Sequence, residues 1–430
     1  MLLLAGETSG AAVPDDNGGS GIVHPPRWAD GSAPRSWGTS STGTQEELKR
    51  RAESEPKQLY SVRAEDRSGE FSPLAFNQPA PATLDECRAY FDTHPDVPVT
   101  QYKNRLAMCQ QYTVVVPFLD CSTNPCQELG SQSFRVIMVG NGSIGKGGIG
   151  EREMIFQLAT DRPATTGAVP PPNERVKFSV ECLPNDGPAC EWDNHHAFSW
   201  EPSLGELREL VPMVSPTFRF MDRTAEGIDP DEQNFFALAP KISHRHLPAG
   251  LLGEDFIVRC DQAAYLGGGS CLYTGIQPIL EYKRTDFPQF TQHLADAQSG
   301  DMSLTKPGIN GKEIPGSLRS EKPLTRLYSG HDQVWYDRNN AIAVANCKLH
   351  WGEDYPNNHP EYKRDCDEYP FRSTHEGAAY NEQMGIDSKW SYSSRAIHRE
   401  DNRAAGRALN NFYNTEHVVH GDAFWVEVID

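Results

Sequence analysis

The chain has 430 residues, of which 37% are hydrophobic and 23% charged, with 32 prolines and 36 glycines. This length suits two domains with separate cores, and the composition favours loop-rich, β-containing structure over a helical bundle. Apolar runs fall short of the roughly 20 residues that cross a bilayer, so we expect no membrane span. The formal net charge of −19 argues against a broad basic surface for nucleic acid. An acidic protein that acts on phosphates would therefore need a bound cation and a few local arginines.

Ten cysteines occur, with no CxxC motif that would indicate a zinc ribbon or a thioredoxin-like centre. Three neighbouring pairs are close enough in sequence to be local disulfides: Cys121 with Cys126, Cys182 with Cys190, and Cys260 with Cys271. An even number of cysteines in such pairs indicates disulfides and an oxidising compartment. The start, MLLLAGETSG, has no basic n-region and too short an apolar stretch for a signal peptide. Export is therefore inferred from the cysteines alone.

Three regions differ in composition. Residues 1–57 are rich in Gly, Ser, Pro, Asp and Glu and are expected to be a disordered leader, in which 46–57 could form a short charged helix without an apolar face. Residues 58–300 hold short apolar or alternating runs between Gly- and Pro-rich turns, which predicts an accessory β-sandwich or barrel. The helical pattern of PQFTQHLADAQS (288–299) is expected to close this domain.

Residues 301–430 begin with a polar connector at 302–322. Strands are expected at AIAVANC (341–347) and DCDEYPF (365–371), followed by an amphipathic helix after Asp401 and a terminal strand, DAFWVEVI (422–429). The predicted order is β-β-α-β, and the predicted fold class of the whole chain is α+β.

Some motifs are better explained by structure than by ligand binding. GNGSIGKGG (140–148) matches G-x-G-x-x-G, but a strand pattern follows it instead of the helix that a phosphate-binding loop needs, so we interpret it as a β-hairpin loop. The histidine pairs His195–His196 and His244–His246 lack a carboxylate or cysteine at metal-ligand spacing. We interpret these histidines as surface or hydrogen-bonded residues.

Acidic residues gather in DCDEYPFRSTHEG (365–377), which contains Asp365, Asp367, Glu368 and Glu376. Neighbouring residues of a strand point to opposite faces, so Asp367 and Glu368 are expected to have different roles. Taken alone, such a cluster is more often a solvated surface than a site.

The helix in HREDNRAAGRALNNFYN (398–414) is expected to start at Asp401 as N-cap. Asn402 then lies in the first turn, where its amide oxygen suits Mg²⁺, Mn²⁺ or Ca²⁺, and Arg403 beside it can hold phosphate oxygens. Gly406 is costly inside a helix and predicts a close approach by another backbone. The alternative interpretation is an ordinary surface helix.

Taken together, CDEYPFRSTHEGAA (366–379), AIHREDNRAAGRALNNFY (396–413) and HGDAFWVEV (420–428) resemble the NucA/NucB deoxyribonucleases, a family of secreted and sporulation-associated bacterial nucleases. The resemblance covers roughly the last 110 residues, while 259–280 and 323–343 resemble more loosely the longer actinobacterial members, which place a β-rich region before the nuclease. Two residues depart from the usual pattern, Ala378 after Glu-Gly and Ala404 after Asn-Arg, and neither removes a candidate side chain.

The resemblance implies a ββα-metal nuclease fold in which an aspartate replaces the usual histidine base. By this resemblance Asp367 would activate water, with Glu368 and Glu376 as supporting carboxylates. Asn402 would hold the metal, with Asn411 as a second metal-ligand candidate, and Arg403 would bind or brace phosphate. Cys366 is expected to pair with Cys347.

The sequence therefore predicts a secreted endonuclease that uses Mg²⁺ or Mn²⁺, with Ca²⁺ as an alternative, and contacts the phosphate backbone of DNA without reading bases. Two other hypotheses remain open. The chain could be a secreted binding protein with an inactive nuclease-like end, or an interbacterial toxin with a dedicated inhibitor or immunity protein as its partner.

Overall fold

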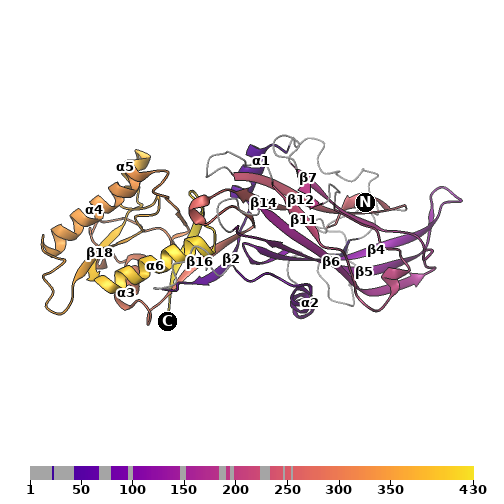
Figure 1. The fold of residues 1–430 in the computed structure, drawn as a ribbon, viewed down its shortest axis with the longest axis horizontal. Coiled ribbons are helices and arrows are strands. Elements are labelled where there is room, and N and C mark those ends of the chain that lie inside the picture. The colour runs from indigo at the N-terminus through magenta and orange to yellow at the C-terminus, as the bar shows by residue number, and fades with distance from the viewer. Residues whose placement is uncertain are drawn as a thin grey trace. The chain divides into compact units, whose positions relative to one another are not determined.

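The computed structural model describes residues 22–23, 43–66, 79–94, 100–145, 152–183, 190–193, 198–222, 233–245, 247–252 and 255–430. Contacts divide the chain into two compact units (Figure 1). The first unit comprises Met1–Gln58, Pro79–Ala264 and Gly268–Ile276, and the second comprises Leu59–Gln78, Tyr265–Gly267 and Gln277–Asp430. The second unit thus takes in stretches that precede residue 301.

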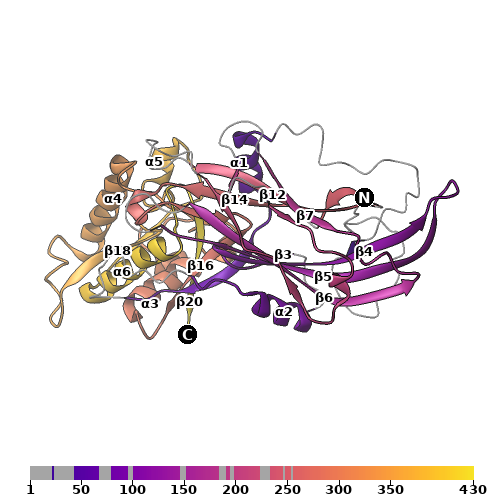
Figure 2. The same cartoon turned by 45° about the vertical axis from the view of Figure 1, so that its right-hand side comes forward.

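The first unit consists mainly of two β-sheets. One has the order β1-β4-β5-β6-β11-β8, with β3 beside β4 and β10 beside β6. Its strands are β1 (Ile22–Val23), β3 (Thr100–Asn104), β4 (Ala107–Asp120), β5 (Gln127–Gly142), β6 (Glu153–Gly167), β8 (Glu191–Trp192), β10 (Met213–Val214) and β11 (Phe218–Met221). Figure 2 shows the long strands β4, β5 and β6 side by side, in agreement with their antiparallel pairing.

The other sheet has the order β15-β14-β12-β7-β9, with β13 beside β12. Its strands are β7 (Lys177–Leu183), β9 (Ser199–Trp200), β12 (Gln233–His244), β13 (Leu247–Leu251), β14 (Phe256–Asp261) and β15 (Ser270–Tyr273). Aromatic rings join the two sheets: the ring centroids of Phe134 and Phe178 are 6.4 Å apart, and those of Phe220 and Phe236 are 5.0 Å apart. Inward-facing aromatic side chains of both sheets thus form one core, as in a sandwich.

Two helices pack on the first unit, α1 (Gln45–Ser54) and α2 (Leu84–Thr93). Leu48 and Ala52 of α1 are buried against side chains of the β12 and β14 strands. The prediction that 46–57 has no apolar face is therefore wrong: these two residues, four apart, form a narrow apolar stripe, and the charged side chains cover the rest of the helix.

Five disulfides are present in the described part of the chain: Cys87–Cys109, Cys121–Cys126, Cys182–Cys190, Cys260–Cys271 and Cys347–Cys366. The three local pairs and the pair Cys347–Cys366 are thereby confirmed. The glycine-rich motif after Gly140 is followed by β6, which pairs antiparallel with β5, so the hairpin interpretation is confirmed, although residues 146–151 lie outside the described residues.

His244 is buried, and its Nε2 lies 2.9 Å from Oε2 of Glu174. The other histidines of those motifs, His195, His196 and His246, lie outside the described residues.

The second unit is a mixed α/β structure. Its four-stranded sheet has the order β17-β20-β16-β2, in which β16 and β20 are parallel. Its strands are β2 (Gln58–Arg63), β16 (Ile276–Lys283), β17 (Leu324–Thr325) and β20 (Ala423–Ile429). A separate antiparallel pair consists of β18 (Arg364–Tyr369) and β19 (Ser393–His398). The helices are α3 (Pro288–Gln298), α4 (Gln333–Trp351), α5 (Tyr380–Met384) and α6 (Arg399–Thr415).

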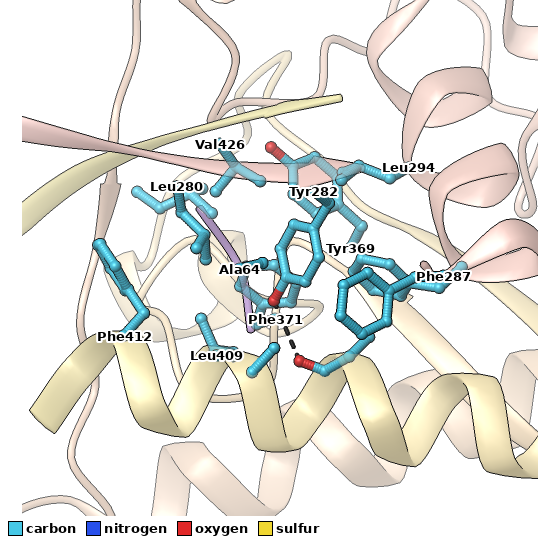
Figure 3. Close-up of a cluster of buried hydrophobic side chains, with 14 of the residues drawn as sticks. Ala64, Leu280, Tyr282, Phe287, Leu294, Tyr369, Phe371, Leu409, Phe412 and Val426 are labelled. Atoms are coloured by element: carbon cyan, nitrogen blue, oxygen red, sulfur yellow. Dashed lines mark hydrogen bonds between the residues drawn. The ribbon is translucent and has the colours of Figure 1, made fainter. Parts of the chain in front are cut away.

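One hydrophobic core holds the second unit together (Figure 3). Leu409 and Phe412 of α6 pack in the same cluster as Leu280 and Tyr282 of β16, and the Tyr282 hydroxyl donates a 3.1 Å hydrogen bond to the Ala405 carbonyl. The α6 helix is therefore fixed to a strand that precedes it by more than 100 residues, so its position is set by tertiary contacts.

The structure of the second unit contradicts predictions made from the sequence. Residues 341–347 belong to α4 and not to a strand, and α3 packs against α6 and β19 instead of closing the β-sandwich. From α4 onward the order of elements is α4, β18, α5, β19, α6 and β20, so the predicted order β-β-α-β is wrong at its first strand, and Ser393–His398 supplies a strand that the sequence pattern did not reveal. The α+β class, with β-rich sheets before a mixed C-terminal region, is confirmed.

Candidate active site

A pocket of about 430 Å³ opens in the second unit along one edge of β18. Among the described strands β18 pairs only with β19, so its other edge is free. Five consecutive residues of β18, 364–368, line the pocket. Helix α6 forms one wall of the pocket and helix α4 another, and further side chains come from α3 and from the turn after β18. The residues from these elements include Phe290, Asn340, Val344, Phe371, Arg372, Asn402, Gly406 and Leu409.

Two neighbouring carboxylates of β18 line one pocket although they point to opposite faces of the strand. Side chains alternate along a strand, and Cys366 faces α4, to which its disulfide with Cys347 joins it. Glu368 lies two residues after Cys366 and therefore points to the same face of the strand, whereas Asp367 points to the other face, toward α3. Both nevertheless line the pocket. The expectation of different roles for Asp367 and Glu368 thus has a geometric basis.

Asp367 is held in place by a histidine from a distant helix. His293 of α3 is fully buried, and its Nδ1 lies 2.6 Å from Asp367 Oδ2. The other ring nitrogen, Nε2, lies 2.9 Å from the Ser393 hydroxyl. Because an ionised carboxylate only accepts hydrogen bonds, Nδ1 is the donor to Asp367. His293 binds only Oδ2 of Asp367, so Oδ1 is not engaged by this histidine. Asp367 also lines the pocket.

Glu368 has a strongly perturbed environment. Burial raises the pKa of its carboxyl to about 8, and the negative charge of Asp367 adds to the shift, whereas Arg372 opposes it through its charge and its backbone N–H. Two adjacent carboxyls with different environments are typical of catalytic sites.

The start of α6 differs in detail from the prediction. The N-cap is His398, whose ring accepts a hydrogen bond from the Glu400 backbone N–H, and not Asp401. Asp401 instead accepts hydrogen bonds from the backbone N–H groups of Gln289 and Phe290, at 2.6 and 2.8 Å, and so caps α3, whose own N-cap residue provides no side-chain bond. This tertiary cap fixes the helix that carries His293.

Asn402 lines the pocket together with Ala405, Gly406 and Leu409, which lie three, four and seven residues further on the same helix face. A Cβ atom added at Gly406 would meet nothing within 4 Å. The prediction that another backbone approaches Gly406 is therefore wrong: the glycine faces the open pocket.

The structure does not bring the other predicted residues into the pocket lining. Asn411 lies nine residues after Asn402, which is half a turn away on a helix, and its side chain donates to the Glu65 carbonyl. Glu376 is buried and accepts from the backbone N–H and the hydroxyl of Thr325.

Arg403 is half exposed and pairs with Asp365, with 3.0 Å between Nε and Oδ2. Arg399 binds the other oxygen of the same carboxylate at 2.9 Å. Asp365 therefore connects β18 to the first turns of α6. Arg403 stabilises this junction, whereas Arg399 also lines the pocket.

Sequence reasoning missed His293 and Arg372. Arg372 directly follows the acidic block DCDEYPF, and this position in the sequence could have identified it as a candidate site residue. His293 had no local signal, because it lies 74 residues before Asp367 in a helix that was expected to belong to the preceding domain.

The pocket offers hard oxygen donors for a divalent cation, namely the carboxylates of Asp367 and Glu368 and the amides of Asn402 and Asn340. Among the described residues no group of three or more His, Cys, Asp or Glu is arranged to hold a metal ion. A cation here would be held by such oxygens together with water, a mode that suits Mg²⁺. The donor types are compatible with such an ion.

The strands β18 and β19 and the helix α6 bring carboxylates, an amide and arginines around one pocket. Residues 318–427 match the family model described as Deoxyribonuclease NucA/NucB, so the C-terminal part of the chain is a domain of this family. No curated protein and no solved structure is significantly similar to the chain. His293, the partner of Asp367, lies outside the matched residues.

Proposed function

We propose that the protein is a secreted, divalent-metal-dependent endonuclease that hydrolyses DNA phosphodiester bonds with little sequence preference. The observation that carries this proposal is that Asp367, Glu368 and Asn402, from a strand and a separate helix, line one pocket within a NucA/NucB domain. Five disulfides support an oxidising compartment. None of the described helices is long and apolar enough to cross a membrane.

In this mechanism Asp367 accepts a proton from the attacking water, and His293 keeps its carboxylate oriented through the Nδ1–Oδ2 hydrogen bond. Asn402, with a carboxylate of the pocket, would hold the cation, which would supply positive charge to offset the negative charge that develops on the phosphate in the transition state. A guanidinium at the pocket can bind nonbridging phosphate oxygens. Nonspecific cleavage requires only contacts to the phosphate backbone, so an acidic protein can use one small site instead of a broad basic surface.

The proposal is tested by plasmid degradation with Mg²⁺ or Mn²⁺ and with EDTA, for the wild type, Asp367→Ala and the matched control Asp387→Ala, whose carboxylate is exposed and outside the pocket. We expect cleavage by the wild type and by the control, loss in EDTA, and a loss of roughly 10²-fold or more for Asp367→Ala. A parallel assay on RNA tests the substrate class. Cleavage by Asp367→Ala at the wild-type rate would remove Asp367 from the role of base.

A further inference from the structure

Arg372 differs from the other arginines at the pocket because its side chain forms no hydrogen bond and no ion pair with the described residues. Its Nε is buried, and it has no hydrogen-bond partner among the described residues. Leaving a buried N–H of a charged group without an acceptor is unfavourable. The residue lines the pocket in which Asp367 and Asn402 lie. An anion bound in this pocket would therefore lie beside a residue whose guanidinium forms no hydrogen bond with the described residues.

The other arginines of the lining are already engaged. Arg399 pairs with Asp365, and Arg364 donates to the Asn358 side chain and to the Tyr355 carbonyl. Glu368 is stabilised in its charged form by Arg372, yet no carboxylate of the described residues forms an ion pair with the Arg372 side chain. Of the arginines that line the pocket, Arg372 is therefore the most available to bind an incoming anion.

Tyr336 of α4 orients this guanidinium. The Cζ atom of Arg372 lies 4.1 Å from the centroid of the Tyr336 ring. Stacking on an aromatic face restricts the planar group and leaves the N–H donors at its edge free to bind an oxyanion. An arginine presented in this way suits the paired oxygens of a phosphate or phosphodiester better than a lysine would.

We infer that Arg372 binds the nonbridging oxygens of a phosphodiester in the pocket and that Tyr336 is a positioning residue for its guanidinium. The inference deepens the proposed nuclease function and rests on it. It assigns substrate binding to Arg372 instead of Arg403, which stabilises the junction between β18 and α6 through Asp365.

The test uses the full chain with Arg372→Gln, Arg372→Lys and Tyr336→Leu. Arg338→Gln is the matched control, because Arg338 is also on the α4 side of the domain but pairs with Glu382 and does not line the pocket. Thermal unfolding of each variant verifies the fold. We expect kcat/KM on a short DNA duplex to fall roughly 10- to 100-fold in Arg372→Gln, with partial recovery in Arg372→Lys. Tyr336→Leu should lower kcat/KM less than Arg372→Gln does.

DNA affinity separates this inference from the proposed function. Each Arg372 substitution is combined with Asp367→Ala, and binding of a fluorescent duplex is measured at several salt concentrations. Removing one phosphate contact should reduce the slope of log affinity against log salt by about 1 in Arg372→Gln and leave it unchanged in Arg338→Gln. If the wild type cleaves no DNA but Arg372→Gln still lowers affinity and slope, only the proposed activity fails. A folded Arg372→Gln protein with the parental affinity and slope would overturn the inference.

Discussion

Two substitutions of His293 separate its two hydrogen bonds. In His293→Asn the side-chain amide nitrogen takes roughly the place of Nδ1 and can still donate to Asp367, whereas the bond to Ser393 is lost. In His293→Gln the longer side chain reaches toward Ser393, and the donor to Asp367 is lost. His293 is fully buried and Asp367 is only 4% exposed, so water does not readily replace either bond.

The expected magnitudes follow from these two contacts. The 2.6 Å bond to the Asp367 carboxylate is charge-assisted and contributes about 1.5–3 kcal/mol, whereas the 2.9 Å bond to the Ser393 hydroxyl contributes about 0.5–1.5 kcal/mol. His293→Asn should therefore lower the free energy of unfolding by about 1 kcal/mol, and His293→Gln by about 2–4 kcal/mol, because it leaves a buried carboxylate unpaired. A base displaced by about 1 Å can cost roughly 10²-fold in rate.

The measurements are urea unfolding and initial rates of plasmid cleavage, with Gln292→Ala as control, since Gln292 is the exposed neighbour of His293 on α3. The expected order of activity is wild type, His293→Asn, and then His293→Gln at about one hundredth of the wild-type rate. Equal activity of the two variants, or higher activity in His293→Gln, would refute the role of His293 in positioning Asp367.

Three further predictions concern other parts of the second unit. Gly406→Ala should raise the free energy of unfolding by up to about 1 kcal/mol, because the added Cβ meets nothing within 4 Å and alanine favours the helix; a lower urea midpoint would contradict this. Burial, together with electrostatic interactions with His375 and His331, lowers the pKa of His420 to about 4, so the unfolded chain binds more protons between that value and about 6.5. The free energy of unfolding should therefore fall as the pH drops through this window, by up to about 3 kcal/mol before solvent screening. Urea unfolding at about pH 7 and about pH 5 measures this difference, which should be smaller in His420→Gln. A fragment of residues 318–430 should be unfolded by circular dichroism, because it lacks the buried core side chains of β16 and α3; a cooperative melt of this fragment would show that the family-model region folds alone.

Local patterns were sufficient for much of the candidate site. The acidic block and the helix after it were recognisable because their residue types and spacing are encoded within short stretches, and the disulfide partners lie near one another in sequence. The sequence also indicated which residues of α6 share a face of the helix. Asn411 follows Asn402 by nine residues, and this spacing places the two side chains on opposite faces.

Helix α4 shows why one element was mispredicted. Its buried residues are Asn339, Ala343, Asn346 and Cys347, at helical spacing. The two asparagines are polar and satisfy their hydrogen bonds inside the structure, with backbone groups near Thr374 and with Ser394. A periodicity of apolar residues therefore could not reveal this face, and the short apolar run 341–347 resembled a strand.

By itself, the sequence determined the α+β class, the cysteine pairs that it predicted, and the two segments whose side chains make up most of the candidate site. Only the tertiary structure decided that β18 has a free edge, that His293 joins Asp367 across 74 residues, and that Arg372 rather than Arg403 faces the pocket. The physical reason is that local propensities act over a few residues, whereas the orientation of a buried carboxylate depends on whichever partner the packed core brings within hydrogen-bonding distance.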